Sequence, residues 1–100
     1  MTTIMLVCSA GMSTSLLVTK MEAAAKVKGI EVKIFAVSEA ESGRHLDNID
    51  VLLLGPQVRY LKKKMVKAVE GKNIPVEIIE SIDYGTMNGD SVLVKALSLL

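Results

Sequence analysis

The sequence predicts an α/β fold, with one open sheet of four parallel strands and helices on both of its faces. Two observations predict this fold class. Four short apolar runs alternate along the chain with longer segments of helical period. Half of the residues are hydrophobic but only 3% are aromatic, so the core must be packed mainly from aliphatic side chains. Such a core is typical of helices that pack on a parallel sheet.

The four expected strands are rich in leucine and β-branched residues, as buried strands are. They comprise residues 4–7, 32–37, 51–54 and 76–79. The connections between them have room for little besides one helix that crosses back over the sheet. Right-handed crossovers and parallel strands are therefore expected.

The helices are expected between these strands and after the last one. The first contains apolar residues at three- and four-residue steps from Leu17 onward, and Gly29 stands where helices often end. Ser38 and Glu41 have the spacing of a capping box, which predicts a short second helix that ends near residue 46.

The second half of the chain has equally clear breaks. The pair Gly55-Pro56 ends the third strand, and a helix with one apolar face then continues to Gly71. Asp90 is expected to cap the last helix. Residues 81–89, before that helix, are expected to form a loop at the carboxyl edge of the sheet.

Length and composition limit the possible classes of protein. The 100 residues are expected to form one domain, residues 1–100, and the net charge of +1 gives no basic field for nucleic acid. One cysteine and one histidine make neither an internal disulfide nor a metal site of familiar spacing, so a reducing cytoplasm is expected. The chain shows no signal-peptide pattern and no apolar run near the roughly 20 residues that span a bilayer.

The only cysteine, Cys8, lies where the first strand gives way to small and hydroxyl residues. Parallel sheets carry their functional loops at this edge. Backbone N–H groups of such a loop and of the following helix N-terminus bind phosphate, and they favour the nucleophilic thiolate. The predicted phosphate-binding residues are Ser9, Ala10, Gly11, Met12, Ser13, Thr14 and Ser15.

Several alternatives compete with a nucleophilic Cys8. A lone cysteine after an apolar strand is often only a small core residue. Cysteine phosphatases have arginine six positions after the cysteine, and that position is Thr14 here, which favours a phosphoryl carrier over a hydrolase. A phosphate-binding module with an inert Cys8 remains open, whereas a redox protein is disfavoured because the chain has no second cysteine.

The segments "CSAGMSTSLLV", "VLLLGPQV" and "IIESIDYGTMNGD" resemble the IIB component of the phosphoenolpyruvate-dependent sugar phosphotransferase system, in the lactose, cellobiose and diacetylchitobiose family. The resemblance extends from residue 4 to about residue 97. It implies a flavodoxin-like three-layer sandwich without cofactor or metal. It also implies a phosphocysteine at Cys8, with Gln57 and Tyr84 as possible residues of a second loop.

The resemblance further implies two protein partners. A histidine of the IIA component would phosphorylate Cys8, and the membrane component IIC, with its bound β-linked disaccharide-type sugar, would accept the group. The protein would then be a cytoplasmic monomer that visits the inner face of the membrane. Because both partners must reach one thiol, a shallow and exposed site is expected.

Overall fold

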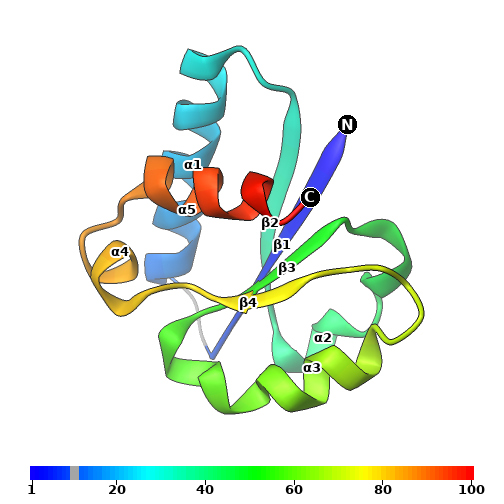
Figure 1. Cartoon of the computed structure of the whole chain (residues 1–100). Helices are drawn as coiled ribbons and strands as arrows, with labels where there is room; N and C mark the ends of the chain where they lie inside the picture. Colours follow the sequence, from blue (N-terminus) through cyan, green and yellow to red (C-terminus); the bar gives the residue numbers. More distant parts are fainter. Residues whose placement is uncertain (10–11) are drawn as a thin grey trace.

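The computed structural model describes residues 1–9 and 12–100 and confirms the predicted fold class (Figure 1). Its strands form a single parallel sheet in the order β2-β1-β3-β4. They are β1 (Thr2–Cys8), β2 (Val32–Ser38), β3 (Val51–Leu54) and β4 (Val76–Ile78). The strands therefore agree with the expected ones to within two residues at each end.

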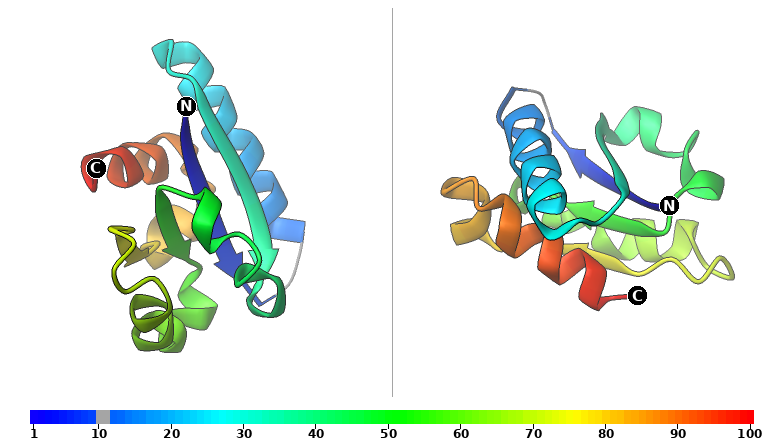
Figure 2. Two further views of the ribbon diagram at one scale, coloured as in Figure 1. Left: turned by 90° about the vertical axis from the view of Figure 1, so that its right-hand side faces the viewer. Right: turned by 90° about the horizontal axis from the view of Figure 1, so that it is seen from above.

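Helices cover both faces of this sheet (Figure 2). One face packs against α1 and α5, and the other against η2 and α3. The α-helices are α1 (Met12–Lys28), α2 (Glu39–Ser42), α3 (Lys62–Ala68), α4 (Ser81–Gly85) and α5 (Gly89–Ser98), and the 3-10 helices are η1 (Leu46–Asn48) and η2 (Pro56–Leu61).

The central strand β1 is buried on both sides. Ile4 and Leu6 belong to the apolar cluster beneath α1 and α5, whereas Met5 and Val7 belong to the cluster beneath α3. All four side chains are fully buried. Successive side chains of a strand point to opposite faces, so a strand with helices on both sides must be apolar at every position. This explains the continuous apolar run in the sequence.

The first helix has the features that its sequence predicts. Its buried residues Leu17, Met21 and Ala25 follow the helical period and pack on the sheet. The helix ends before Gly29, which has a φ of 69° that favours glycine. Lys26 and Lys28 lie in its last turn, where positive charge is favourable, and no acidic residue lies in its first turn.

The second helix is shorter than expected, because α2 ends at Ser42 and not near residue 46. The chain continues through three-residue turns, in which the N–H groups of Arg44 and His45 donate to the carbonyls of Glu41 and Ser42. Glycine at position 43 disfavours a longer α-helix. The capping box is also incomplete, because the Ser38 hydroxyl contacts the Glu41 carboxylate at 3.5 Å and caps no backbone N–H.

The third helix has the predicted apolar face but different bounds. Pro56 begins the 3-10 helix η2, and Val58 has non-helical backbone angles, so α3 starts only at Lys62. It ends at Ala68, three residues before Gly71, whose φ is 83°. The buried residues of this segment are Val58, Leu61, Met65 and Val69, which follows α3 directly, and they confirm the predicted face.

Two expectations for the last segment are wrong. Residues 81–85 of the expected loop form the short helix α4. The cap of α5 is Asn88, whose side-chain oxygen accepts from the Ser91 N–H at 3.1 Å. Asp90 lies instead in the first turn of α5 and forms an ion pair with Lys28.

Within the described part of the chain, no helix is both long and apolar enough to cross a bilayer.

Candidate functional site

Cys8 ends β1 at the carboxyl edge of the sheet. In the sheet, β1 lies between β2 and β3. Cys8 pairs with Ser38 at the end of β2, and the Gly55 N–H donates to the Val7 carbonyl at 2.9 Å on the other side. The chain passes from β1 to β2 on one side, whereas β3 lies on the other. In open parallel sheets this change of direction is where ligands bind.

The thiol is less accessible than the sequence led us to expect. Only 5% of Cys8 is exposed, whereas the next residue, Ser9, is exposed. The boundary between interior and solvent thus falls between these two residues. Cys8 lies between the ends of β2 and β3, and it belongs to neither of the two apolar core clusters.

The expected phosphate-binding segment is described in part. Ala10 and Gly11 lie outside the described residues, as do the side chains of Met12 and Ser13. Helix α1 begins at Met12, four residues after the thiol. Its first N–H groups have no partners within the helix, and no acidic residue in its first turn opposes an anion.

The hydroxyls of the first turn of α1 differ in their surroundings. Thr14 is only 1% exposed, and its hydroxyl lies 2.9 Å from that of Tyr84. Ser15 is exposed, and its carbonyl accepts from the Thr19 hydroxyl. Thr14 therefore anchors α1 to α4, and its hydroxyl is engaged within the protein. Of the polar groups of Thr14, the backbone N–H is the one that could bind an anion at the start of α1.

The loop after β3 reaches the same place. A Cβ atom built on Gly55 would lie 2.6 Å from Gln57 Oε1 and 3.6 Å from Cys8 Cβ. The Gln57 side chain therefore lies over Gly55, on the side of Cys8. Glycine at position 55 leaves the space that this amide occupies, and the amide has both donors and an acceptor for an incoming ligand.

The structure thus places the Gln57 amide and Cys8 beside the same residue, Gly55, and it brings Tyr84 to the helix that follows the thiol. This arrangement offers a nucleophile, a helix N-terminus and an amide at one edge of the sheet. No group of three or more possible metal ligands occurs among the described residues. This arrangement fits a nucleophile that forms a covalent bond to an oxyanion group, such as a phosphoryl group, while N–H groups bind its oxygens.

Comparison with known proteins agrees with this chemistry. Residues 3–95 match the family described as "PTS system, Lactose/Cellobiose specific IIB subunit". The chain belongs to this family. It is therefore a phosphotransferase component of a sugar phosphotransferase system, of the lactose and cellobiose type.

Curated relatives cover nearly the whole chain. The galactose-specific and the cellobiose-specific EIIB components of two Lactococcus lactis strains are each 46% identical to it, over 97% of this chain and 94% of theirs. The oligo-beta-mannoside-specific EIIB component of Bacillus subtilis is 42% identical, with the same coverage. The predicted resemblance to IIB components is thereby confirmed.

Two solved structures of IIB proteins have the same fold. The cellobiose-specific IIB component of Borrelia burgdorferi is 48% identical, with a TM-score of 0.81 over 98% of this chain and 90% of that one. The lactose-specific IIB domain of Streptococcus pneumoniae has a TM-score of 0.87 at 16% identity, over 97% and 95% of the two chains. The second likeness concerns the fold alone.

Sequence reasoning missed the bond between Thr14 and Tyr84. It assigned Thr14 to phosphate binding and considered Tyr84 separately. The two residues lie 70 positions apart, so no local pattern could pair them. The available signal was Tyr84 itself, which lies between the last strand and the last helix. A buried tyrosine usually has a hydrogen-bond partner, so a partner could have been sought.

Proposed function

We propose that the 100 residues act as one phosphocarrier domain in which Cys8 holds the phosphoryl group. The observation that carries this proposal is the position of the thiol at the end of β1, four residues before the N-terminus of α1. The lack of arginine in this segment supports a carrier over a hydrolase, since phosphatases use that charge in the attack by water.

In the first step the Cys8 thiolate attacks phosphorus in line with the leaving imidazole of a phosphohistidine on the IIA component. The S–P bond forms as the N–P bond breaks, and the imidazole keeps the electron pair of that bond. N–H groups at the start of α1 bind the equatorial oxygens, whose charge spreads in the transition state. The Gln57 amide adds a donor from the β3 side.

In the second step a sugar hydroxyl attacks the same phosphorus. The O–P bond forms, the S–P bond breaks, and the thiolate of Cys8 is released for another cycle. The hydroxyl proton passes to a base on the membrane component IIC, which holds the sugar. Slow hydrolysis of the thiophosphate is part of this function, because the group must survive until the acceptor arrives.

The names of the relatives support a proposal for the sugar class. Their names refer to galactose, cellobiose and oligo-beta-mannosides. For this chain we propose a β-linked disaccharide or a related β-glycoside, bound by IIC. The domain would be a cytoplasmic monomer that reaches the inner face of the membrane through IIC.

A transfer assay tests the proposal. The protein is incubated with phosphoenolpyruvate, the general phosphotransfer proteins and a family IIA component, and membranes with IIC and cellobiose are then added. We expect labelled wild-type protein to lose its label to the sugar, and Cys8→Ser to transfer none. Transfer by Cys8→Ser at the wild-type rate would contradict the proposal.

The same material separates the carrier from a hydrolase. A cysteine phosphatase would release inorganic phosphate from an aryl phosphate over many turnovers. For a carrier we expect no turnover beyond background, and a label that persists until the acceptor is added. Sustained release of phosphate that depends on Cys8 would support the hydrolase instead.

A further inference from the structure

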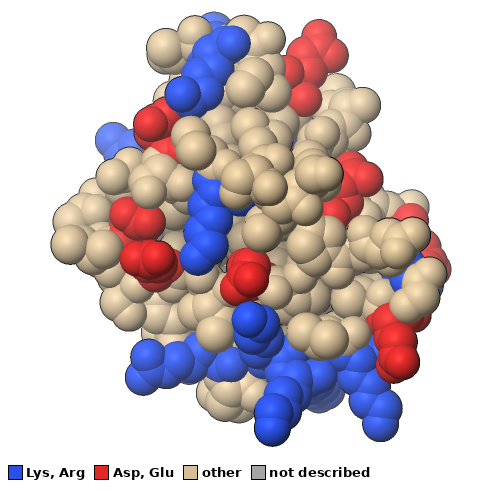
Figure 3. Space-filling view, viewed as in Figure 1, with Lys and Arg blue, Asp and Glu red and all other residues tan. Residues whose placement is uncertain are grey.

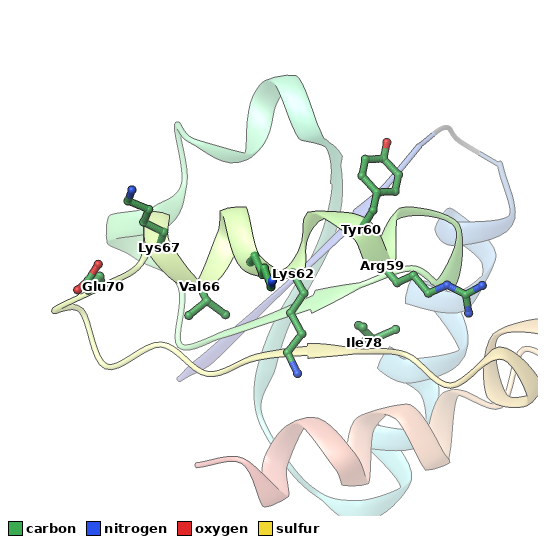
Figure 4. Close-up of a pocket in the computed structure, with 8 residues that line it drawn as sticks. Arg59, Tyr60, Lys62, Val66, Lys67, Glu70 and Ile78 are labelled. Atoms are coloured by element: carbon green, nitrogen blue, oxygen red, sulfur yellow. The ribbon is translucent and has the colours of Figure 1, made fainter.

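A groove of about 750 Å³ lies between α3 and the edge strand β4 (Figure 4), and Cys8 is not among the residues that line it. Arg59 and Tyr60 lie near one end, and Lys67 and Glu70 near the other. The lining residues are Arg59, Tyr60, Lys62, Lys63, Val66, Lys67, Glu70 and Ile78. Nothing in the transfer chemistry of Cys8 uses these residues.

The charge of the groove is strongly one-sided. Four of its lining residues are basic and one is acidic, whereas the whole chain has a net charge of only +1. Lys62 forms an ion pair with Glu77 at 3.2 Å. For Arg59, Lys63 and Lys67, the described residues supply no ion-pair partner. Blue side chains accordingly gather along the lower rim of Figure 3, where α3 lies.

The groove also exposes apolar surface. Tyr60 is 75% exposed and Val66 is 48% exposed, although both lie on elements whose opposite face is buried. Aromatic residues and arginine are enriched in protein interfaces, where they contribute much of the binding energy. Exposed Tyr60 and Val66 between cations therefore indicate a surface for a polypeptide that is both acidic and apolar.

We propose that this groove docks an acidic, partly apolar segment of the polypeptide that donates the phosphoryl group. The inference rests on the proposed function. A concave surface with an aromatic rim fits a protein segment better than a flat bilayer. The acceptor fits less well, because cytoplasmic loops of membrane proteins are rich in lysine and arginine, which the groove would repel.

The groove adjoins the thiol through a single element. Helix η2 begins directly after Gly55, whose N–H bonds to β1, and it carries Gln57 and then Arg59 and Tyr60. A donor that reaches Cys8 past Gln57 therefore meets the end of the groove. Contacts there would raise the rate of encounter without touching the reacting atoms.

Charge reversal in the groove tests this inference. The double variant Lys63→Glu with Lys67→Glu reverses the charge of two exposed residues on one face of α3. We expect KM for the phosphorylated IIA component to rise about tenfold at low salt, with kcat within about twofold, and the difference to shrink as salt is added. Tyr60→Ala should also raise KM, but without the salt dependence.

The matched control changes the same number of charges elsewhere. Lys20 and Lys26 are exposed on α1, on the other side of the sheet, so Lys20→Glu with Lys26→Glu should leave KM within about twofold. Circular dichroism and thermal unfolding verify that both variants fold. If the double glutamate variant of α3 unfolds, Lys63→Gln with Lys67→Gln replaces it, with a smaller expected rise in KM.

The outcomes separate the two proposals. If the groove variant and the control accept phosphoryl groups with the wild-type KM, the docking inference is wrong while the carrier function stands. If the groove variant keeps the wild-type KM but no longer sediments with phosphatidylcholine–phosphatidylglycerol vesicles, as the wild-type protein does, the surface binds a membrane and the inference is also wrong. If wild-type protein accepts no phosphoryl group, the carrier function fails, and the docking inference with it.

Discussion

The hydroxyl pair of Thr14 and Tyr84 links the start of α1 to α4. Both residues are at least nine-tenths buried, and their oxygen atoms lie 2.9 Å apart. A hydrogen bond in such surroundings contributes about 1 kcal/mol, and losing one partner costs more when the other stays buried. This bond fixes the turn whose N–H groups would receive the phosphoryl oxygens.

A double-mutant cycle measures this link. We expect Thr14→Val and Tyr84→Phe each to lower the free energy of unfolding by about 1 to 2 kcal/mol. The double variant should lose about 0.5 to 1.5 kcal/mol less than the sum, because both changes remove one shared bond. The measurement is urea unfolding followed by circular dichroism.

Thr19→Val is the control for this cycle. Thr19 lies on the same helix, but it is exposed and its hydroxyl donates to the carbonyl of Ser15, one turn earlier. Its replacement should change stability by less than about 0.5 kcal/mol. A coupling energy near zero between Thr14 and Tyr84 would show that the two hydroxyls act independently.

The positions of single residues could be predicted from the sequence where a local pattern determines the element in which they lie. Cys8 at the end of a strand and Gln57 in the neighbouring loop were expected at one edge, and the parallel topology brings them there. The burial of Cys8 could not be foreseen, because it depends on contacts between segments that are distant in the sequence. For the same reason the engagement of Thr14 by Tyr84 is visible only in three dimensions.

The backbones of α1 and α5 approach each other closely at a glycine. A Cβ atom built on Gly89 would lie 2.4 to 2.6 Å from backbone atoms of Lys20 and Met21. Backbone cannot move aside as the end of a flexible side chain can. Glycine at the first position of α5 therefore sets how closely this helix approaches α1.

Replacement of this glycine should destabilise the protein strongly. We expect Gly89→Ala to lower the free energy of unfolding by about 2 to 3 kcal/mol, since one methyl group must push two helices apart. Gly85→Ala is the matched control, because its Cβ would meet nothing within 4 Å and its φ is negative. That change should lie within about 1 kcal/mol of wild type. Equal melting temperatures for the two variants would refute the close-approach argument.

Element types were easier to predict than element ends. The apolar stripes of α1 and α3 identified which face is buried, because burial requires a matching period. The ends of α2 and α3 depend on competition between α-helical and three-residue turns, which differ by little free energy. Helix α4 was missed because five residues are too few to show a period.

At the scale of the whole molecule, one sheet serves two cores. Leu52 and Leu53 are adjacent on β3 and fully buried, yet they belong to clusters on opposite faces. Neither core can persist without the sheet, so a domain of this size should unfold as a single cooperative unit.

Truncation on either face tests this unity. We expect Leu52→Ala and Leu53→Ala each to lower the free energy of unfolding by about 2 to 5 kcal/mol. The dependence of that free energy on urea should stay at the wild-type value, because the same surface is exposed on unfolding. The measurement is urea unfolding monitored by circular dichroism and by amide exchange. A second transition in either variant would show that the two cores unfold separately.

The central claim is that sulfur at position 8 carries the phosphoryl group. Its most direct test is mass spectrometry of the wild-type protein after incubation with phosphoenolpyruvate, the general phosphotransfer proteins and a IIA component. We predict one added phosphoryl group, located on Cys8 by fragmentation, and none on Cys8→Ser. An unmodified Cys8 beside an active donor, or a phosphoryl group on another residue, would contradict the account.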